Sequence, residues 1–281
     1  MTKETDGKGV VSNPLEPLTR RVRSDVVVYG VMHQGFVAET GKQFRKVIRH
    51  ADHLLIEGEP DDISAYVSTA RGLSTGISRG YESEAAGIFV SRGKEKNIHA
   101  LEGPKWSYCE KYGLDGEILF ARDMFSYGVQ GGGFPLGNVA WTVDAWKKHE
   151  QPFFDHVSSE QLAGVVQRIN NMMQPSLGRR LFSVLTGERH RFIEGALITL
   201  EYIATMRDHE EIVPNSLKLA NTLKGSKVVI VGKAHVPNQE RAFAGLELEP
   251  LLPWEGYVQS LSGQDKKAVA TFQSIIRDHK K

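Results

Sequence analysis

The sequence predicts an α/β fold, with a central and mostly parallel sheet that is flanked by helices and carries a helical insertion or cap. Two short runs of β-branched residues, 26–31 and 227–232, are typical of strands that are covered on both faces. Apolar residues at helical spacing follow the first run and lead to another short apolar run, as in a strand-helix-strand unit. Strand signals then disappear between about 104 and 220, which predicts the insertion.

The elements follow one another in a regular order. Short apolar runs predict strands over 26–31, 54–57, 97–102 and 227–232. Helical periodicity predicts helices over about 40–51, 84–92, 161–173, 188–208 and 268–277. We therefore expect a polar N-terminal leader over 1–24 and a single α/β domain over 25–281, with the helical insertion at about 104–220.

The composition restricts the classes of partner that we expect the protein to bind and the cellular compartment in which we expect it. The 35 Lys and Arg nearly balance the 34 Asp and Glu, so no long-range field should attract nucleic acid or an anionic membrane. Cys109 is the one cysteine, which excludes an intrachain disulfide framework and a zinc site built from several thiolates. Neither a secretory signal nor a membrane-spanning run is recognisable. We expect a soluble, cytoplasmic protein.

Two of the predicted strands are followed by histidine in the same way. The pattern Gly-x-x-His occurs at Gly30 to His33 and at Gly232 to His235, and a third copy at 187–190 follows no predicted strand. With 28 Gly and 10 His in the chain, about one such tetrapeptide is expected by chance. The position is the informative part, because ligand sites in open α/β sheets lie beyond the carboxyl ends of the strands. The alternative is that each histidine merely caps its strand through backbone hydrogen bonds.

Carboxylates also follow predicted strands. Glu57 directly follows an apolar run and Glu59 comes two residues later, so strand alternation would place both on one side of the chain. A buried carboxylate needs a partner, and a divalent cation held by His33, Glu57 and His235 would supply one. The alternative is a salt bridge at the rim of the sheet. Glu102, at another strand end, is a further candidate of the same kind.

Arg207 continues the apolar face of the helix predicted over 188–208, so its guanidinium should point inward. It could clamp a carboxylate or stabilise an oxyanion. The alternative is a cation at the end of a helix, where it interacts with the helix dipole.

These blocks resemble the TraB/PrgY family, which is related to the GumN and Tiki proteins within a superfamily of erythromycin-esterase-like and ChaN-like proteins. Residues 29–33 and 54–59 are similar to the family's first Gly-x-x-His and its strand-ending Glu-x-Asp, with Glu59 where Asp is usual. Residues 206–208 and 228–236 are similar to its Glu-Arg-Asp and final Gly-x-x-His, with Met206 in place of Glu. Glu102-Gly103 replaces the Asp-Arg that often ends the third strand.

The resemblance implies a metal-dependent hydrolase, and peptide cleavage is proposed for the Tiki branch. We expect His33, Glu57 and His235 to hold a divalent ion, with Mn, Co and Zn as candidates, and Glu59 or Glu102 to act as general base. Arg207 would stabilise an oxyanion or hold a substrate carboxylate, and the insertion would close over a small-molecule or peptide substrate. A metal-free, esterase-like hydrolase and a non-catalytic ligand-binding relative remain as alternatives, and oligomerisation stays open.

Overall fold

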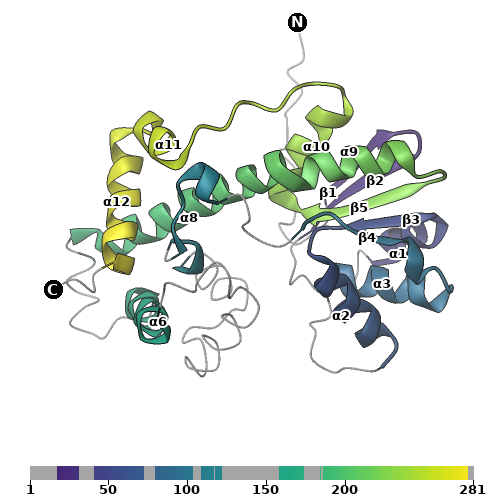
Figure 1. Ribbon diagram of the computed structural model, residues 1–281, viewed down its shortest axis with the longest axis horizontal. Helices are drawn as coiled ribbons and strands as arrows, with labels where there is room; N and C mark the ends of the chain where they lie inside the picture. Colours follow the sequence, from purple (N-terminus) through teal and green to yellow (C-terminus); the bar gives the residue numbers. More distant parts are fainter. Residues whose placement is uncertain are drawn as a thin grey trace, which may run out of the picture. The chain divides into compact units, whose positions relative to one another are not determined.

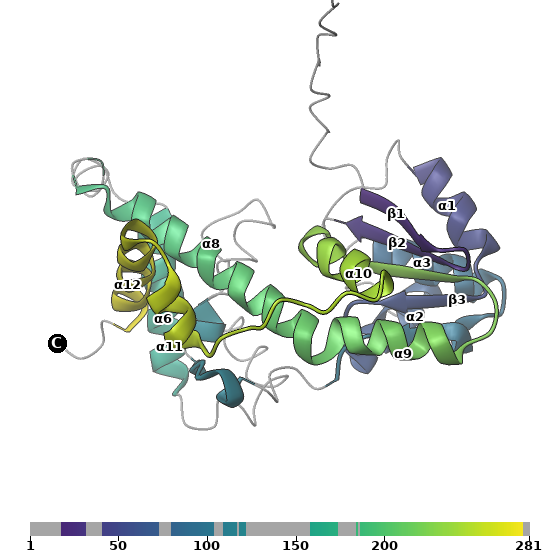
Figure 2. The ribbon, with the colours of Figure 1, turned by 90° about the horizontal axis from the view of Figure 1, so that it is seen from above.

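The computed structural model describes residues 18–31, 41–72, 80–103, 109–116, 118–121, 158–173, 184 and 186–277. The chain forms two compact units (Figures 1 and 2). The first comprises residues 1–100 and 218–244, and the second comprises residues 101–217 and 245–281. The predicted insertion at about 104–220 corresponds to the first segment of the second unit. That unit also includes the C-terminal segment, which the sequence-based organisation places with the sheet.

The first unit contains a mixed, mostly parallel sheet of five strands, which confirms the predicted α/β class. The strands lie in the order β1-β2-β5-β3-β4. β1 is antiparallel to β2, and the other neighbouring strands are parallel. Their bounds are Leu18–Arg23 for β1, Val26–Val31 for β2, His53–Ile56 for β3, Ile98–Ala100 for β4 and Lys227–Gly232 for β5.

The place of each strand in the sheet follows from its composition. All six residues of β5 are buried, as expected for an apolar strand in the centre of a parallel sheet. β1 has several exposed positions and three arginines, which suits an edge strand. The prediction of a leader over 1–24 is therefore wrong for residues 18–23, because these residues form β1. The burial of apolar residues on the rest of the sheet outweighs the polar composition of this edge.

Three helices cover one face of the sheet: α1 (Gly41–His50), α2 (Pro60–Ala70) and α3 (Tyr81–Ser91). Alternate residues of the strands, including Leu54 and Ile230, pack against aromatic side chains of these helices. Phe44 lies in edge contact with Tyr29 and with Tyr81, at ring-centroid distances of 5.2 and 5.1 Å. This apolar layer fixes the register of the strands, because a slip of one residue would turn it toward the opposite face.

The opposite face of the sheet carries the intervening residues of each strand, among them the buried Val28, Leu55 and Val229. The chain reaches this face directly after β5, through the short helix η4 (Lys233–His235) and then α10 (Val236–Phe243). Figures 1 and 2 show α10 on the side of the sheet away from α1, α2 and α3. The segment that carries His235 is therefore held at the sheet by β5, which precedes it in the chain, and by α10, which follows it.

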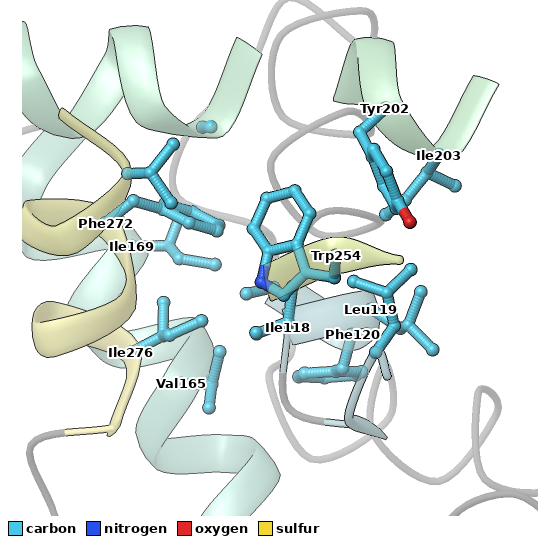
Figure 3. Packing of buried hydrophobic residues seen from close by; sticks show 14 of the residues in the cluster. Ile118, Leu119, Phe120, Val165, Ile169, Tyr202, Ile203, Trp254, Phe272 and Ile276 are labelled. Atoms are coloured by element: carbon cyan, nitrogen blue, oxygen red, sulfur yellow. The ribbon is translucent and has the colours of Figure 1, made fainter. Parts of the chain in front are cut away.

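The second unit is helical where it is described. Its helices are α6 (Ser159–Met173), α8 (Glu188–Arg207), the first half of α9 (Val213–Thr222), α11 (Trp254–Ser260) and α12 (Gly263–Arg277). Trp254 lies in the middle of the apolar cluster between them (Figure 3). α8 and α12 approach so closely that a Cβ added to Gly195 would lie 2.3 Å from the Ala268 carbonyl oxygen. A glycine is required at this crossing.

A π-helical turn, η3 (Asp208–Ile212), interrupts the path from α8 to α9. Two short 3-10 turns, η1 (Glu95–Asn97) and η2 (Glu110–Tyr112), precede β4 and follow it along the chain. Among the described helices, no segment combines the length and the apolar character that crossing a bilayer requires.

Candidate functional site

Glu57 directly follows β3, at the carboxyl end of the strand. Its backbone N–H donates to the Ile230 carbonyl oxygen at 2.9 Å, so the β3–β5 ladder continues for one bond past the end of β3. This bond holds the Glu57 backbone beside the end of β5. The Glu57 side chain is only 4% exposed, and burying a carboxylate at this depth is costly unless it has a polar partner.

His235 provides that partner. It ends the short helix η4, three residues after the last residue of β5, and its side chain is also only 4% exposed. His235 Nε2 lies 3.3 Å from Glu57 Oε1. The strand order explains the meeting, because β5 is the neighbour of β3 in the sheet. Two of the three metal ligands expected from the sequence are therefore in direct contact.

The second glycine of the repeated pattern takes part in the same arrangement. The backbone N–H of Gly232 donates to Glu57 Oε2 at 2.5 Å, so both oxygens of the carboxylate are engaged by the chain that leaves β5. Charge-assisted bonds of this kind are among the stronger hydrogen bonds in proteins. This amide is not among the site groups predicted from the sequence, and its signal is the glycine that ends the buried strand.

The first glycine of the pattern makes room for the His235 segment. A Cβ added to Gly30 would lie 2.4 Å from Val236 Cγ2 and 3.2 Å from Lys233 Cα, closer than packed side chains tolerate. Gly30 therefore permits the close approach of β2 to the residues on either side of His235.

His33, the third expected ligand, lies outside the described residues. The description of β2 ends two residues earlier at Val31, which is in register with Gly232 of β5. The contact expected between His33 and the Glu57–His235 pair is thus untested and stays a prediction.

Glu59 lies at the start of α2. Its backbone N–H donates to Asp62 Oδ2 at 3.0 Å, one half of a capping box. β3 ends at Ile56, and Gly58 has a φ of 137°, so the chain turns between the two glutamates. The strand alternation that would place Glu57 and Glu59 on one side therefore does not apply.

Glu102 and Arg207, both in the second unit, bind one another. Arg207 Nε donates to Glu102 Oε1 at 2.7 Å, and a terminal guanidinium nitrogen donates to Oε2 at 2.8 Å. The Glu102 side chain is 2% exposed and that of Arg207 is 16% exposed. Arg207 thus clamps a carboxylate, as its inward orientation predicts, and this carboxylate belongs to the chain. Both oxygens of the candidate base Glu102 are engaged by it.

Neighbouring residues hold the same two segments together. Asn215 Nδ2 donates to the Leu101 carbonyl oxygen at 2.8 Å. In the π-helical turn η3, Glu210 accepts hydrogen bonds from Lys111 and Tyr112, each at 2.5 Å. Burial would raise the pKa of Glu210, but these two hydrogen bonds, together with the charges of Lys111 and His209, outweigh it and hold the pKa below its usual value. The extra residue of a π-helical turn changes which side chains face inward.

No protein-family model, no curated protein and no solved structure matches this chain. The residues of the chain and their geometry are therefore the basis for inferring a function.

The Glu57–His235 pair has the chemistry of a polar site and of a partial cation site. An imidazole nitrogen and a carboxylate oxygen are suitable ligands for divalent transition metals, and the Gly232 N–H would orient the carboxylate from outside. Within the described ranges, no group of three or more His, Cys, Asp or Glu side chains is arranged to hold a metal. The described residues therefore fit two positions of a metal site, and completing it requires His33 or another group outside them.

Proposed function

We propose that this chain is a hydrolase of the TraB/PrgY type, dependent on a divalent metal and acting on a peptide or a related small substrate at the Glu57–His235 pair. The direct contact of these two buried side chains beyond adjacent parallel strands carries the proposal. This is where open α/β sheets place their ligands. The residues that would hold the metal are Glu57, His235 and, by its position in the sequence, His33.

The metal would lower the pKa of a bound water and polarise the bond to be cleaved. The chain supplies the orientation of its ligands, since the Gly232 N–H holds Glu57 and the packing of η4 against Gly30 holds His235. Glu59, one of the two candidate bases, is partly exposed, and its side chain accepts the backbone N–H of Asp62 in the capping box of α2. Glu102 is less well supported, because Arg207 engages both of its oxygens.

A metal-free hydrolase is the second candidate, and a specific observation favours it. The 3.3 Å separation of His235 Nε2 from Glu57 Oε1 also fits a dyad in which a carboxylate orients an imidazole. The ring nitrogen that does not face Glu57 would then take the proton from the attacking group. Such a dyad needs neither His33 nor a metal.

Metal analysis and turnover measured on the same preparations test the proposal. The wild-type chain, Glu57→Gln and His235→Asn would be loaded with Mn, Co or Zn, and their metal content and hydrolysis of peptide and ester panels would be compared with and without a chelator. We expect about one metal per chain in the wild type, with metal and turnover both lost in the two variants. His50→Gln and Glu240→Gln, which change an exposed and a half-buried residue of the same unit, should retain both.

The other outcomes are distinguishable. Turnover that resists the chelator but is lost in His235→Asn would replace the metal-dependent proposal with the metal-free dyad. Turnover that is undiminished in both variants would contradict a site at this pair. Ligand binding without turnover in the wild-type chain would favour a non-catalytic protein instead.

A further inference from the structure

A second histidine pair lies on the sheet of the first unit, outside the proposed site. His53 begins β3 and His99 lies in β4, on the same face of the two neighbouring strands. His53 Nδ1 is 3.2 Å from His99 Nε2, and the ring centroids are 5.4 Å apart. His53 Nε2 lies 3.1 Å from the Lys224 carbonyl oxygen. The two imidazole rings and the Lys224 carbonyl oxygen therefore form one hydrogen-bonded chain, in which three of the four ring nitrogens take part.

This chain determines where the protons lie. A carbonyl oxygen can only accept, so His53 Nε2 carries a hydrogen. In the neutral pair, His53 Nδ1 then carries a lone pair, and His99 Nε2–H donates to it. One added proton is accommodated on His53, because its Nδ1–H donates to His99 Nε2 once His99 carries its hydrogen on Nδ1. A second added proton would place two N–H groups face to face at 3.2 Å.

We propose that the His53–His99 pair is a proton-sensitive latch that holds the edge strand β4 on β3 near neutral pH and releases it in mild acid. β4 is at the end of the strand order and has three residues in register with β3. Short edge elements of this kind open more readily than the central strands. Because the chain enters the second unit directly after β4, opening would free the segment that leads to Glu102.

The direction of the pH effect follows from the number of protons that each state binds. The latched strand accommodates one added proton on the pair, whereas the opened strand allows both rings to be protonated. Acid therefore favours opening. The geometry agrees with the pKa of His99, which burial and then the neighbouring His53 hold below its usual value. The stability that His99 contributes is fully present above the pKa that His99 has in the unfolded chain. It is lost as the pH falls below that pKa.

Three carboxylates around the pair have ionic partners of their own. Asp52 is paired with Lys94, Asp25 with Lys227, and Glu95 with Arg71. Further charged side chains on the adjoining segments are Lys224 before β5, Lys218 on α9, Lys96 in η1, and Asp61 and Asp62 in the first turn of α2. These three carboxylates are engaged by cations, and the two rings are in direct contact with one another.

The test combines histidine NMR with amide hydrogen exchange on the full chain. In the wild type at neutral pH, we expect neutral His53 in the Nε2–H form. Between pH 7.5 and 5.5, exchange of the β4 amides, corrected for intrinsic rates, should rise up to about tenfold relative to the β5 amides, because opening takes up one more proton per molecule. His99→Gln should abolish this rise, because an amide can donate to His53 or accept from it.

His50→Gln, which changes an exposed histidine at the end of α1, is the matched control and should behave as the wild type. A neutral His53 in the Nδ1–H form, or β4 exchange in the wild type that does not change with pH, would overturn the proposal. So would an acid response that persists in a folded His99→Gln variant. Should that variant fail to fold, the wild-type tautomer and exchange still decide the matter.

Discussion

Glu57 and His235 meet across the boundary between β3 and β5, with 3.3 Å between Oε1 and Nε2, although they belong to distant parts of the sequence. The contact depends on the insertion of the late strand β5 between β2 and β3. A carboxylate and an imidazole that are each 4% exposed stabilise one another, because burial makes polar contacts within the protein valuable. Removing either one leaves the other buried with fewer polar contacts.

We therefore predict that Glu57→Ala destabilises the chain by about 3–5 kcal/mol, the usual cost of breaking a buried pair. Glu57→Gln should cost less, about 1–3 kcal/mol, since the amide can still accept from the Gly232 N–H. Urea unfolding measures both. Glu240→Ala, which removes the half-buried ion-pair partner of Arg20 in the same unit, should change the free energy of unfolding by less than about 1 kcal/mol. Equal effects at positions 57 and 240 would contradict a buried pair.

The parts of the fold that could be predicted are those with a local signal. The β-branched runs of β2 and β5 predict their exact bounds, because residues buried on both faces leave an uninterrupted apolar pattern. β1 was missed because an edge strand with three arginines has no such pattern. The central place of β5 could not be predicted either, since strand order depends on long-range packing that is not encoded in any one segment.

The candidate site shows the same division. Glu57 and His235 could be selected because each follows a buried strand, a feature of the local sequence. The pairing of Arg207 with Glu102 joins residues 105 positions apart, and no local pattern indicates which carboxylate an inward guanidinium will meet. The strand alternation that underlies the prediction for Glu59 does not extend to it, because β3 ends at Ile56 and Gly58 has a positive φ.

Gly30→Ala tests how closely β2 approaches the His235 segment. The new methyl group would overlap Val236 Cγ2, and we expect a loss of about 1–3 kcal/mol from overpacking. Val236→Ala in the same chain should recover part of this loss, because it removes the overlapping methyl. Thermal or urea unfolding of the two single variants and the double variant gives the coupling.

Gly87→Ala in α3 is the matched control for that series. Its methyl would meet Ala70 Cβ at 3.9 Å, an ordinary contact, and alanine favours a helix. It should stabilise the chain by about 0.5–1 kcal/mol. A Gly30→Ala variant as stable as the wild type would show that β2 and the start of α10 lie further apart than described.

Asp52 should make the stability of the chain depend on pH in acid. The Ser226 backbone N–H, followed by Lys94 and the Ser226 hydroxyl, lowers the pKa of Asp52 to about 2. An unfolded aspartate titrates near 3.9. Because the folded pKa is the lower one, this stability is complete above about pH 5 and is lost as the pH falls through about 4 toward about 2.

Between pH 5 and pH 3, the urea concentration at the midpoint of unfolding should therefore fall less in Asp52→Asn than in the wild type. Part of the fall should remain, because the lowered pKa of Asp25 also contributes to it. Since the Asp52 side chain is 48% exposed, added salt should weaken the contribution of Lys94. The contribution of the Ser226 N–H should persist, because a short hydrogen bond is screened little. A pH dependence in Asp52→Asn identical to that of the wild type, or one abolished entirely by salt, would contradict this assignment.

Arg207→Lys tests whether the two-pronged geometry matters more than the charge. Lysine keeps the charge but cannot donate to both oxygens of Glu102 in one plane, so we expect a loss of about 1–3 kcal/mol in the free energy of unfolding. Arg277→Lys is the matched control, because Arg277 pairs with Asp115 where both side chains are more than 40% exposed, and it should change stability by less than about 0.5 kcal/mol. If the two lysine variants change the free energy of unfolding equally, the two-pronged geometry of Arg207 contributes nothing to stability. The contact with Arg207 would then no longer count against Glu102 as a candidate base.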